Sequence, residues 1–224
     1  MHKLWAEGIG TAFLLIGVVG SGIMGATFSG GNIAVALLAN AIATGCVLYV
    51  IITTLGPISG AHFNPAVTLA FWLRNEIGTT LALQYVAVQI CAGIAGVWAA
   101  HMMFDLPVLQ LSTTARTGAS QWFSEVLATF GLLFVIFGGL RARPDAVPVL
   151  VALYITGAYW FTASTSFANP AVTIARAFSD TFAGILPAHV PMFILMQIVG
   201  VGIAALVLPR LFPNAVRSAT SPKE

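Results

Sequence analysis

The sequence predicts an all-α membrane protein, in which six transmembrane helices and two re-entrant half-helices form an inverted repeat. Three observations support this prediction. Charged residues are too few to cover a water-facing surface, six apolar runs are long enough to cross a bilayer, and one short motif occurs once in each half of the chain. We expect residues 1–224 to form a single membrane domain.

The composition separates this chain from soluble proteins. Apolar residues make up 58% of the sequence and charged residues 7%, with a mean hydropathy of +0.95. A soluble domain carries roughly a quarter charged residues. The net charge of +2 gives no strong basic field, so nucleic acid is not an expected partner. The lipid bilayer is the expected surrounding.

Six apolar runs qualify as membrane spans. A helix needs about 20 apolar residues to cross the hydrocarbon core. The predicted spans are 4–27, 33–56, 79–103, 121–141, 147–165 and 188–209. An even number of spans places both termini on the same side of the membrane.

Basic residues predict which side that is. One side receives Lys3, Arg74, Arg141, Arg143, Arg210, Arg217 and Lys223. The other side receives Arg116 and Arg176. Because cytoplasmic loops are enriched in Lys and Arg, both termini are predicted to be cytoplasmic, including a short C-terminal tail at 211–224. We expect a multi-pass protein of the plasma membrane, which in bacteria is the inner membrane.

The repeated motif reads Asn-Pro-Ala-Val-Thr, followed by Leu or Ile and then Ala, and it begins at Asn64 and at Asn169. Asparagine is a good N-cap, and proline suits the first helical position because its missing N–H is not needed there. Each motif therefore predicts the start of a half-helix, over about 64–74 and 169–178. Non-helical backbone at membrane depth survives only where protein buries it or where it lines a water-filled cavity.

The two halves, about 1–104 and 118–210, share further polar positions. Each half has a glutamate early in its first span, Glu7 or Glu125, and a glutamine in its third span, at 89 or 197. Three spans per half is an odd number, so the second half must be inserted upside down. Inverted repeats place their functional elements near the midplane, where the halves meet.

These features together resemble the aquaporin and aquaglyceroporin family, also called the major intrinsic proteins, over essentially the whole chain. The Ser-Gly-Ala-His-Phe-Asn-Pro-Ala string from Ser59 to Ala66, the second Asn-Pro-Ala, the two glutamates and the third-span glutamine all match that family. The resemblance implies the hourglass fold and a homotetramer with one pore per subunit. It also implies passive permeation of small neutral solutes, with no cofactor, no metal and no enzymatic activity.

The resemblance assigns roles to residues that match its motifs. The pore motifs are Asn64, Pro65, Ala66, Asn169, Pro170 and Ala171. The two asparagine amides are expected to donate hydrogen bonds to the passing solute and to interrupt a proton-conducting chain of water. Glu7 and Glu125 are expected to accept hydrogen bonds from the re-entrant loops. His62 is expected to brace the first loop, with a gating role as the alternative.

The selectivity filter departs from the family pattern. Typical members have an arginine directly after the second Asn-Pro-Ala, where this chain has Val172. A gap-free count places the other three filter positions at Thr44, Gly157 and Ser166. That set contains no aromatic side chain and no charge. It predicts a wider constriction than in a water-specific pore, because pore diameter and lining donors set selectivity.

Such a filter is expected to admit glycerol, urea or neutral metalloid hydroxides, and passage of water stays open. It resembles bacterial aquaglyceroporin-like channels linked to arsenic resistance, a resemblance that implies passage of arsenite and some methylated arsenicals. Arg176 lies four residues beyond Val172, and two readings of it stay open: a charge at the outer vestibule, or an ordinary arginine reaching the interface.

Four alternatives to this channel are a water-selective channel, an inverted-repeat secondary transporter, a junction protein and an enzyme. A transporter would need a substrate charge or an ion-coupling site, and the predicted pore lining offers neither.

Overall fold

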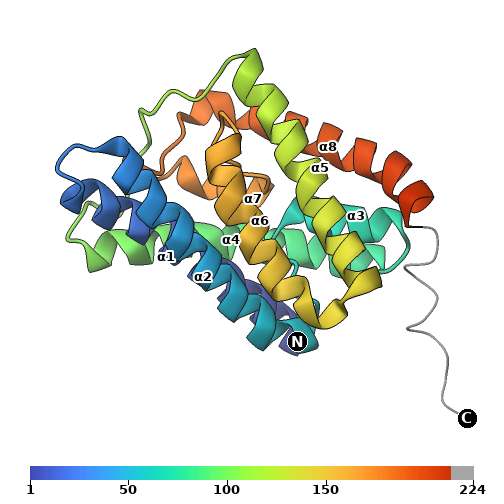
Figure 1. Ribbon diagram of the computed structural model, residues 1–224. Coiled ribbons are helices and arrows are strands. Elements are labelled where there is room, and N and C mark those ends of the chain that lie inside the picture. Colours follow the sequence, from blue (N-terminus) through green and yellow to red (C-terminus); the bar gives the residue numbers. More distant parts are fainter. Residues whose placement is uncertain (213–224) are drawn as a thin grey trace, which may run out of the picture.

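The computed structural model describes residues 1–212, and every regular element in that part is helical (Figure 1). The six long helices are α1 (His2–Phe28), α2 (Ile33–Ser59), α4 (Thr79–Met103), α5 (Ala119–Ala142), α6 (Val147–Phe161) and α8 (Val190–Leu211). Short 3-10 turns at Pro144–Ala146 and Pro187–His189 lead into α6 and α8. With those turns included, all six are long and apolar enough to cross a membrane, as predicted.

The two half-helices are present and slightly shorter than predicted. They are α3 (Pro65–Leu73) and α7 (Pro170–Arg176). The predicted span 147–165 was too long, since α6 ends at Phe161. The residues that follow it form the re-entrant loop, where backbone with positive φ replaces the helix.

The helices pack as two equivalent halves. Helix α1 packs against α2 and α4, and its counterpart α5 packs against α6 and α8. The halves meet along α2 and α6, and each half-helix contacts both α4 and α8. In Figure 1 the half-helices α3 and α7 lie between the long helices, where the two halves come together. This arrangement holds both Asn-Pro-Ala motifs inside the bundle.

Glycines permit the closest helix crossings. A Cβ at Gly96 of α4 would overlap the carbonyl oxygen of Ala12 in α1. A Cβ at Gly200 of α8 would lie 2.7 Å from the carbonyl oxygen of Val126 in α5. Backbones that approach so closely at small residues are typical of helix packing inside membranes. The crossing of α1 with α4 and the equivalent crossing of α5 with α8 therefore both depend on a glycine.

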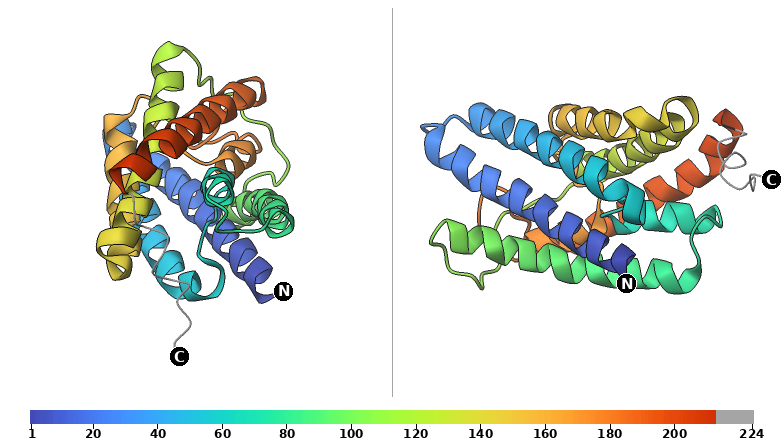
Figure 2. Two further views of the ribbon diagram at one scale, coloured as in Figure 1. Left: turned by 90° about the vertical axis from the view of Figure 1, so that its right-hand side faces the viewer. Right: turned by 90° about the horizontal axis from the view of Figure 1, so that it is seen from below.

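The N-terminus and the end of α8 lie toward the same end of the bundle (Figure 2). Helices α3 and α5 also end there (Figure 2). Arg74 directly follows α3, Arg141 lies in the last turn of α5 and Arg143 directly follows α5, so all three lie at that end. Arg217, Lys223 and the predicted tail from residue 213 onward lie outside the described residues. The cytoplasmic assignment of this end stays a prediction.

Candidate functional site

The two re-entrant loops have the same backbone conformation. In the first loop Gly60, Ala61 and Phe63 have φ angles of 90°, 50° and 47°. In the second loop the residues 105 positions further on, 165, 166 and 168, have φ angles of 61°, 51° and 47°. Positive φ is costly for residues other than glycine, so it persists only where surrounding contacts enforce it. Both loops are therefore shaped by the buried groups around them.

Glu7 supplies those contacts for the first loop. Its carboxylate is fully buried and accepts hydrogen bonds from the backbone N–H groups of His62 and Phe63, at 2.9 and 2.7 Å. The Ser59 hydroxyl and the Gln89 amide donate to it at 2.7 and 2.8 Å. A buried carboxylate needs such partners. Glu7 thus binds a loop that has no secondary structure of its own.

Glu125 repeats the arrangement in the second half. It is also fully buried and accepts from the N–H groups of Phe167 and Ala168, both at 2.9 Å. The Ser164 hydroxyl and the Gln197 amide complete the set, both at 2.6 Å. In both halves the donors are two consecutive loop N–H groups, a serine hydroxyl at the start of the loop and the glutamine amide of the third span. The loop-supporting arrangement expected for the two glutamates is what the structure contains.

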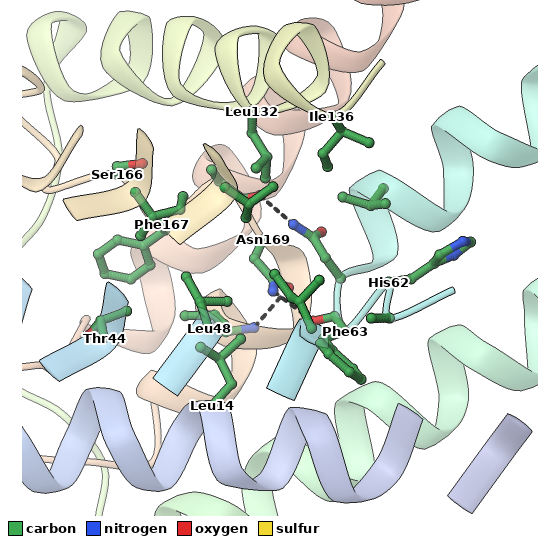
Figure 3. Close-up of a pocket in the computed structure, with 18 of the residues that line it drawn as sticks. Leu14, Thr44, Leu48, His62, Phe63, Leu132, Ile136, Ser166, Phe167 and Asn169 are labelled. Carbon is green, nitrogen blue, oxygen red and sulfur yellow. Dashed lines mark hydrogen bonds between the residues drawn. The ribbon is translucent and has the colours of Figure 1, made fainter. Parts of the chain in front are cut away.

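The two motif asparagines begin their half-helices and cross-link the loops. Asn64 Oδ1 accepts from the Ala66 N–H at 2.8 Å, and Asn169 Oδ1 accepts from the Ala171 N–H at 3.0 Å. Each Nδ2 donates across the midplane: Asn64 to Ala168 O at 2.7 Å and Asn169 to the carbonyl of the other loop at 2.8 Å (Figure 3). An amide nitrogen has two N–H groups. Each asparagine therefore keeps one N–H group that can donate a hydrogen bond to a solute.

A cavity of about 210 Å³ runs past the two motif asparagines, where the half-helices begin. Residues spaced four apart, and so on one helix face, form its apolar wall. These wall residues are Leu14 and Val18 of α1, Leu48 and Ile52 of α2, Leu132, Ile136 and Leu140 of α5, and Val147, Val151 and Ile155 of α6. The two re-entrant loops and both motif asparagines line the cavity as well. A solute inside the cavity therefore contacts an apolar wall on one side and hydrogen-bonding groups on the other.

Three of the four predicted filter residues line the cavity: Thr44, Ser166 and Val172. Gly157 does not, so that assignment was wrong. It lies on the exposed face of α6. Two residues along a helix is a rotation of about 200°, which turns Gly157 away from the side that carries Ile155. The gap-free count failed because it ignored the helix face.

Tyr159 takes the position that the count gave to Gly157. It lines the cavity, and its hydroxyl lies 3.3 Å from Thr44 Oγ1. The four-residue spacing from Val147 through Val151 and Ile155 predicts this position, but the count from the motif did not use that spacing. The expectation of a filter without an aromatic side chain is corrected: the cavity has Tyr159, and Phe167 also lines it.

Because Tyr159 lines the cavity and Gly157 does not, we expect different results from two substitutions in α6. Tyr159→Ala removes a ring from the cavity wall and is expected to raise the flux of glycerol and larger solutes relative to water. Gly157→Ala adds a methyl group that meets Phe161 at 3.9 Å and nothing closer, so it is expected to leave the flux unchanged. Light-scattering flux in proteoliposomes measures both. A response to Gly157→Ala with none to Tyr159→Ala would restore the original assignment.

His62 of the first re-entrant loop and Arg176 of α7 also line the cavity. His62 Nδ1 lies 3.0 Å from the Thr68 hydroxyl, and its ring is 4.6 Å from that of Phe71. Arg176 ends α7 and is buried, with its guanidinium over the Phe167 ring. Arg176 thus adds a charge to the cavity lining outside the four predicted filter positions. Its burial does not fit the alternative reading of an arginine that reaches the interface.

Six apolar spanning helices around two opposed half-helices, with a cavity between them, define a multi-pass membrane protein with the architecture of a channel. A profile of the major intrinsic protein family matches residues 1–158. The aquaglyceroporin AqpS of Rhizobium meliloti (strain 1021) is 52% identical over 205 residues, which cover 92% of this chain and 87% of that protein. Human aquaporin-5 is 33% identical over 201 residues, covering 80% and 71%.

A solved structure supports the same fold. The X-ray structure of the aquaglyceroporin from Plasmodium falciparum matches with a TM-score of 0.75 at 18% identity, covering 95% of this chain and 98% of that one. The chain belongs to the major intrinsic protein family. Members of this family are passive membrane channels for small solutes and not enzymes, which confirms the predicted class.

Proposed function

We propose that this protein is a wide-filter channel of the aquaglyceroporin type, which passes glycerol and neutral metalloid hydroxides such as arsenite. The observation that carries the proposal is Val172. It is buried and it lines the cavity. The family resemblance implies that typical members have arginine at this position. Valine removes five N–H donors and one fixed charge from that position. More room and a less polar wall favour solutes larger than water.

The lining supports neutral solutes that carry several hydroxyl groups. Asn64 and Asn169 can donate to solute oxygens, and Thr44, Tyr159 and Ser166 add hydroxyl groups. The apolar stripes of α1, α2, α5 and α6 face the carbon backbone of such a solute. The relative that is 52% identical is named an aquaglyceroporin, which agrees with this substrate class. Methylated arsenicals belong to the same proposal.

The assembly and the location are part of the proposal. A homotetramer would cover large apolar side chains that are exposed on one subunit, and lipid would cover the rest. The excess of basic residues at the end that holds the N-terminus favours a cytoplasmic location for that end. A bacterial inner membrane fits the bacterial source of the relative that is 52% identical.

The test is flux through the purified protein in liposomes. Water, glycerol and As(OH)₃ are presented in parallel under osmotic gradients, with empty liposomes as the baseline. The proposal predicts that all three fluxes exceed the baseline and that glycerol and As(OH)₃ pass at rates comparable with each other. Fast water flux with baseline glycerol and As(OH)₃ flux would identify a water-selective channel. Absence of any flux would favour a structural junction protein.

A further inference from the structure

Arg176 is a buried cation in the outer part of the cavity, which here means the part beyond Val172 on the side away from Asn169. It is 2% exposed, and its Cζ lies 3.5 Å from the centroid of the Phe167 ring. Its Nε donates to Ala183 O. Its two terminal nitrogens make no hydrogen bond with any residue between 1 and 212, and the side chain lines the cavity. Donors and a positive charge therefore face the solute path.

A second arginine stands behind the first. Arg116 comes from the segment between α4 and α5, and its Cζ lies 5.2 Å from the same Phe167 ring. Its Nε donates to Gly184 O at 2.7 Å. Burial lowers the pKa of Arg116, but arginine titrates so high that it keeps its charge. Both guanidinium groups are thus fixed by the carbonyls of one short stretch, Ala183 and Gly184.

Neither arginine has a carboxylate partner in the described part of the chain. The ion pairs found there join Arg74 to Glu76 and Arg143 to Asp145. Glu125, the buried acid of this half, is instead committed to N–H and hydroxyl donors of the second loop and to the Gln197 amide. A buried charge that forms no ion pair keeps a long-range field, because little water screens it. The outer part of the cavity is therefore positive.

The equivalent position in the first half is uncharged. Residues 105 positions earlier than Phe167 and Arg176 are His62 and Phe71, whose rings make the corresponding contact at 4.6 Å. The two halves share their fold, their caps and their glutamates, but they differ here. The charge is thus specific to the outer half and is not a requirement of the half-helix fold.

We propose that Arg176, held over Phe167 and backed by Arg116, forms a cation barrier one helical turn outward from Val172. Four residues of helix place it about 6 Å further along the axis. There it can repel cations while leaving the position of Val172 open to larger neutral solutes. The inference rests on the proposed channel function. In this arrangement Arg176 excludes cations and Val172 sets the size limit, so two residues of α7 perform the two tasks.

The test compares cation flux with neutral flux in the same proteoliposomes. Arg176→Gln and Arg176→Met both remove the charge, and the methionine keeps an unbranched stem against the Phe167 ring. Each is expected to raise the uptake of methylammonium and Na⁺ by roughly tenfold or more, because a desolvated unit charge a few ångströms away exceeds thermal energy. Glycerol flux is expected to stay within about twofold. Arg143→Gln, at a surface ion pair, is the control and should leave both fluxes unchanged.

A charge rescue separates electrostatics from structural support. Val172→Arg in the Arg176→Gln background returns one positive charge to the cavity, and it is expected to restore cation exclusion while water flux persists. A leak that comes from a loosened loop would not be reversed by that second change. Cation uptake at the wild-type level in both Arg176 variants, with glycerol flux intact, overturns the barrier. Absence of neutral flux in the wild type would instead contradict the channel proposal itself.

Discussion

Replacing Glu125 with alanine is expected to abolish solute flux and to destabilise the fold. The substitution removes the acceptor for the N–H groups of Phe167 and Ala168, the Ser164 hydroxyl and the Gln197 amide. Unsatisfied buried donors cost about 1–3 kcal/mol each, so the total is on the order of 5 kcal/mol or more. That is a large fraction of the stability of a typical domain. The second loop would lose the contacts that enforce its positive-φ backbone.

Thermal unfolding in detergent, combined with glycerol flux in liposomes, measures this effect. Glu125→Gln is the conservative variant and is expected to fall between alanine and the wild type, because the amide keeps one acceptor oxygen. Asp145→Ala, at an exposed ion pair, is the matched control and should change neither stability nor flux measurably. A Glu125→Ala protein that unfolds and conducts like the control would show that the carboxylate does not support the loop.

Replacing Val172 with arginine is expected to close the pore to the larger solutes. The longer side chain would fill space at a buried position of the cavity wall and would add a charge and five N–H donors. Glycerol and As(OH)₃ flux is expected to fall by at least about tenfold, which corresponds to about 1.4 kcal/mol in the barrier. Water flux should fall much less, because water is smaller than either solute.

The ratio of glycerol flux to water flux is the informative quantity, since it cancels differences in the amount of protein reconstituted. Val172→Ile is the control, because it adds one methyl group and no charge. An unchanged glycerol to water ratio in Val172→Arg would mean that residue 172 does not set the limiting width. The filter would then have to be sought elsewhere along the cavity.

Much of this fold could be predicted from the sequence because the bilayer imposes simple constraints. Span length follows from bilayer thickness, and the repeated Asn-Pro-Ala string marks both half-helices by cap chemistry. The glutamates were found because a carboxylate in a span needs partners. Those partners include the backbone N–H groups of Phe63 and Ala168, which belong to loops without a periodic sequence pattern. They became visible only in three dimensions.

The filter was harder to predict because it depends on which face a helix presents. Counting residues placed Gly157 on the pore, whereas the four-residue spacing of α6 places Tyr159 there. The charge of Arg176 was noted from spacing along α7, but its burial against Phe167 was not predictable. Nor was the contribution of Arg116, which lies 60 residues earlier in an irregular segment. Contacts between distant loops leave no periodic signal.

The central claim is that neutral solutes diffuse passively through the cavity where the two half-helices meet. The most direct test is the initial rate of glycerol entry into proteoliposomes as the external concentration rises, with and without proton and Na⁺ gradients. For a passive channel we expect the initial rate of glycerol entry to rise linearly with the external concentration. That rate should be the same with and without the proton and Na⁺ gradients. Saturation at low concentration, or accumulation of glycerol driven by either gradient, would contradict it and would identify a secondary transporter.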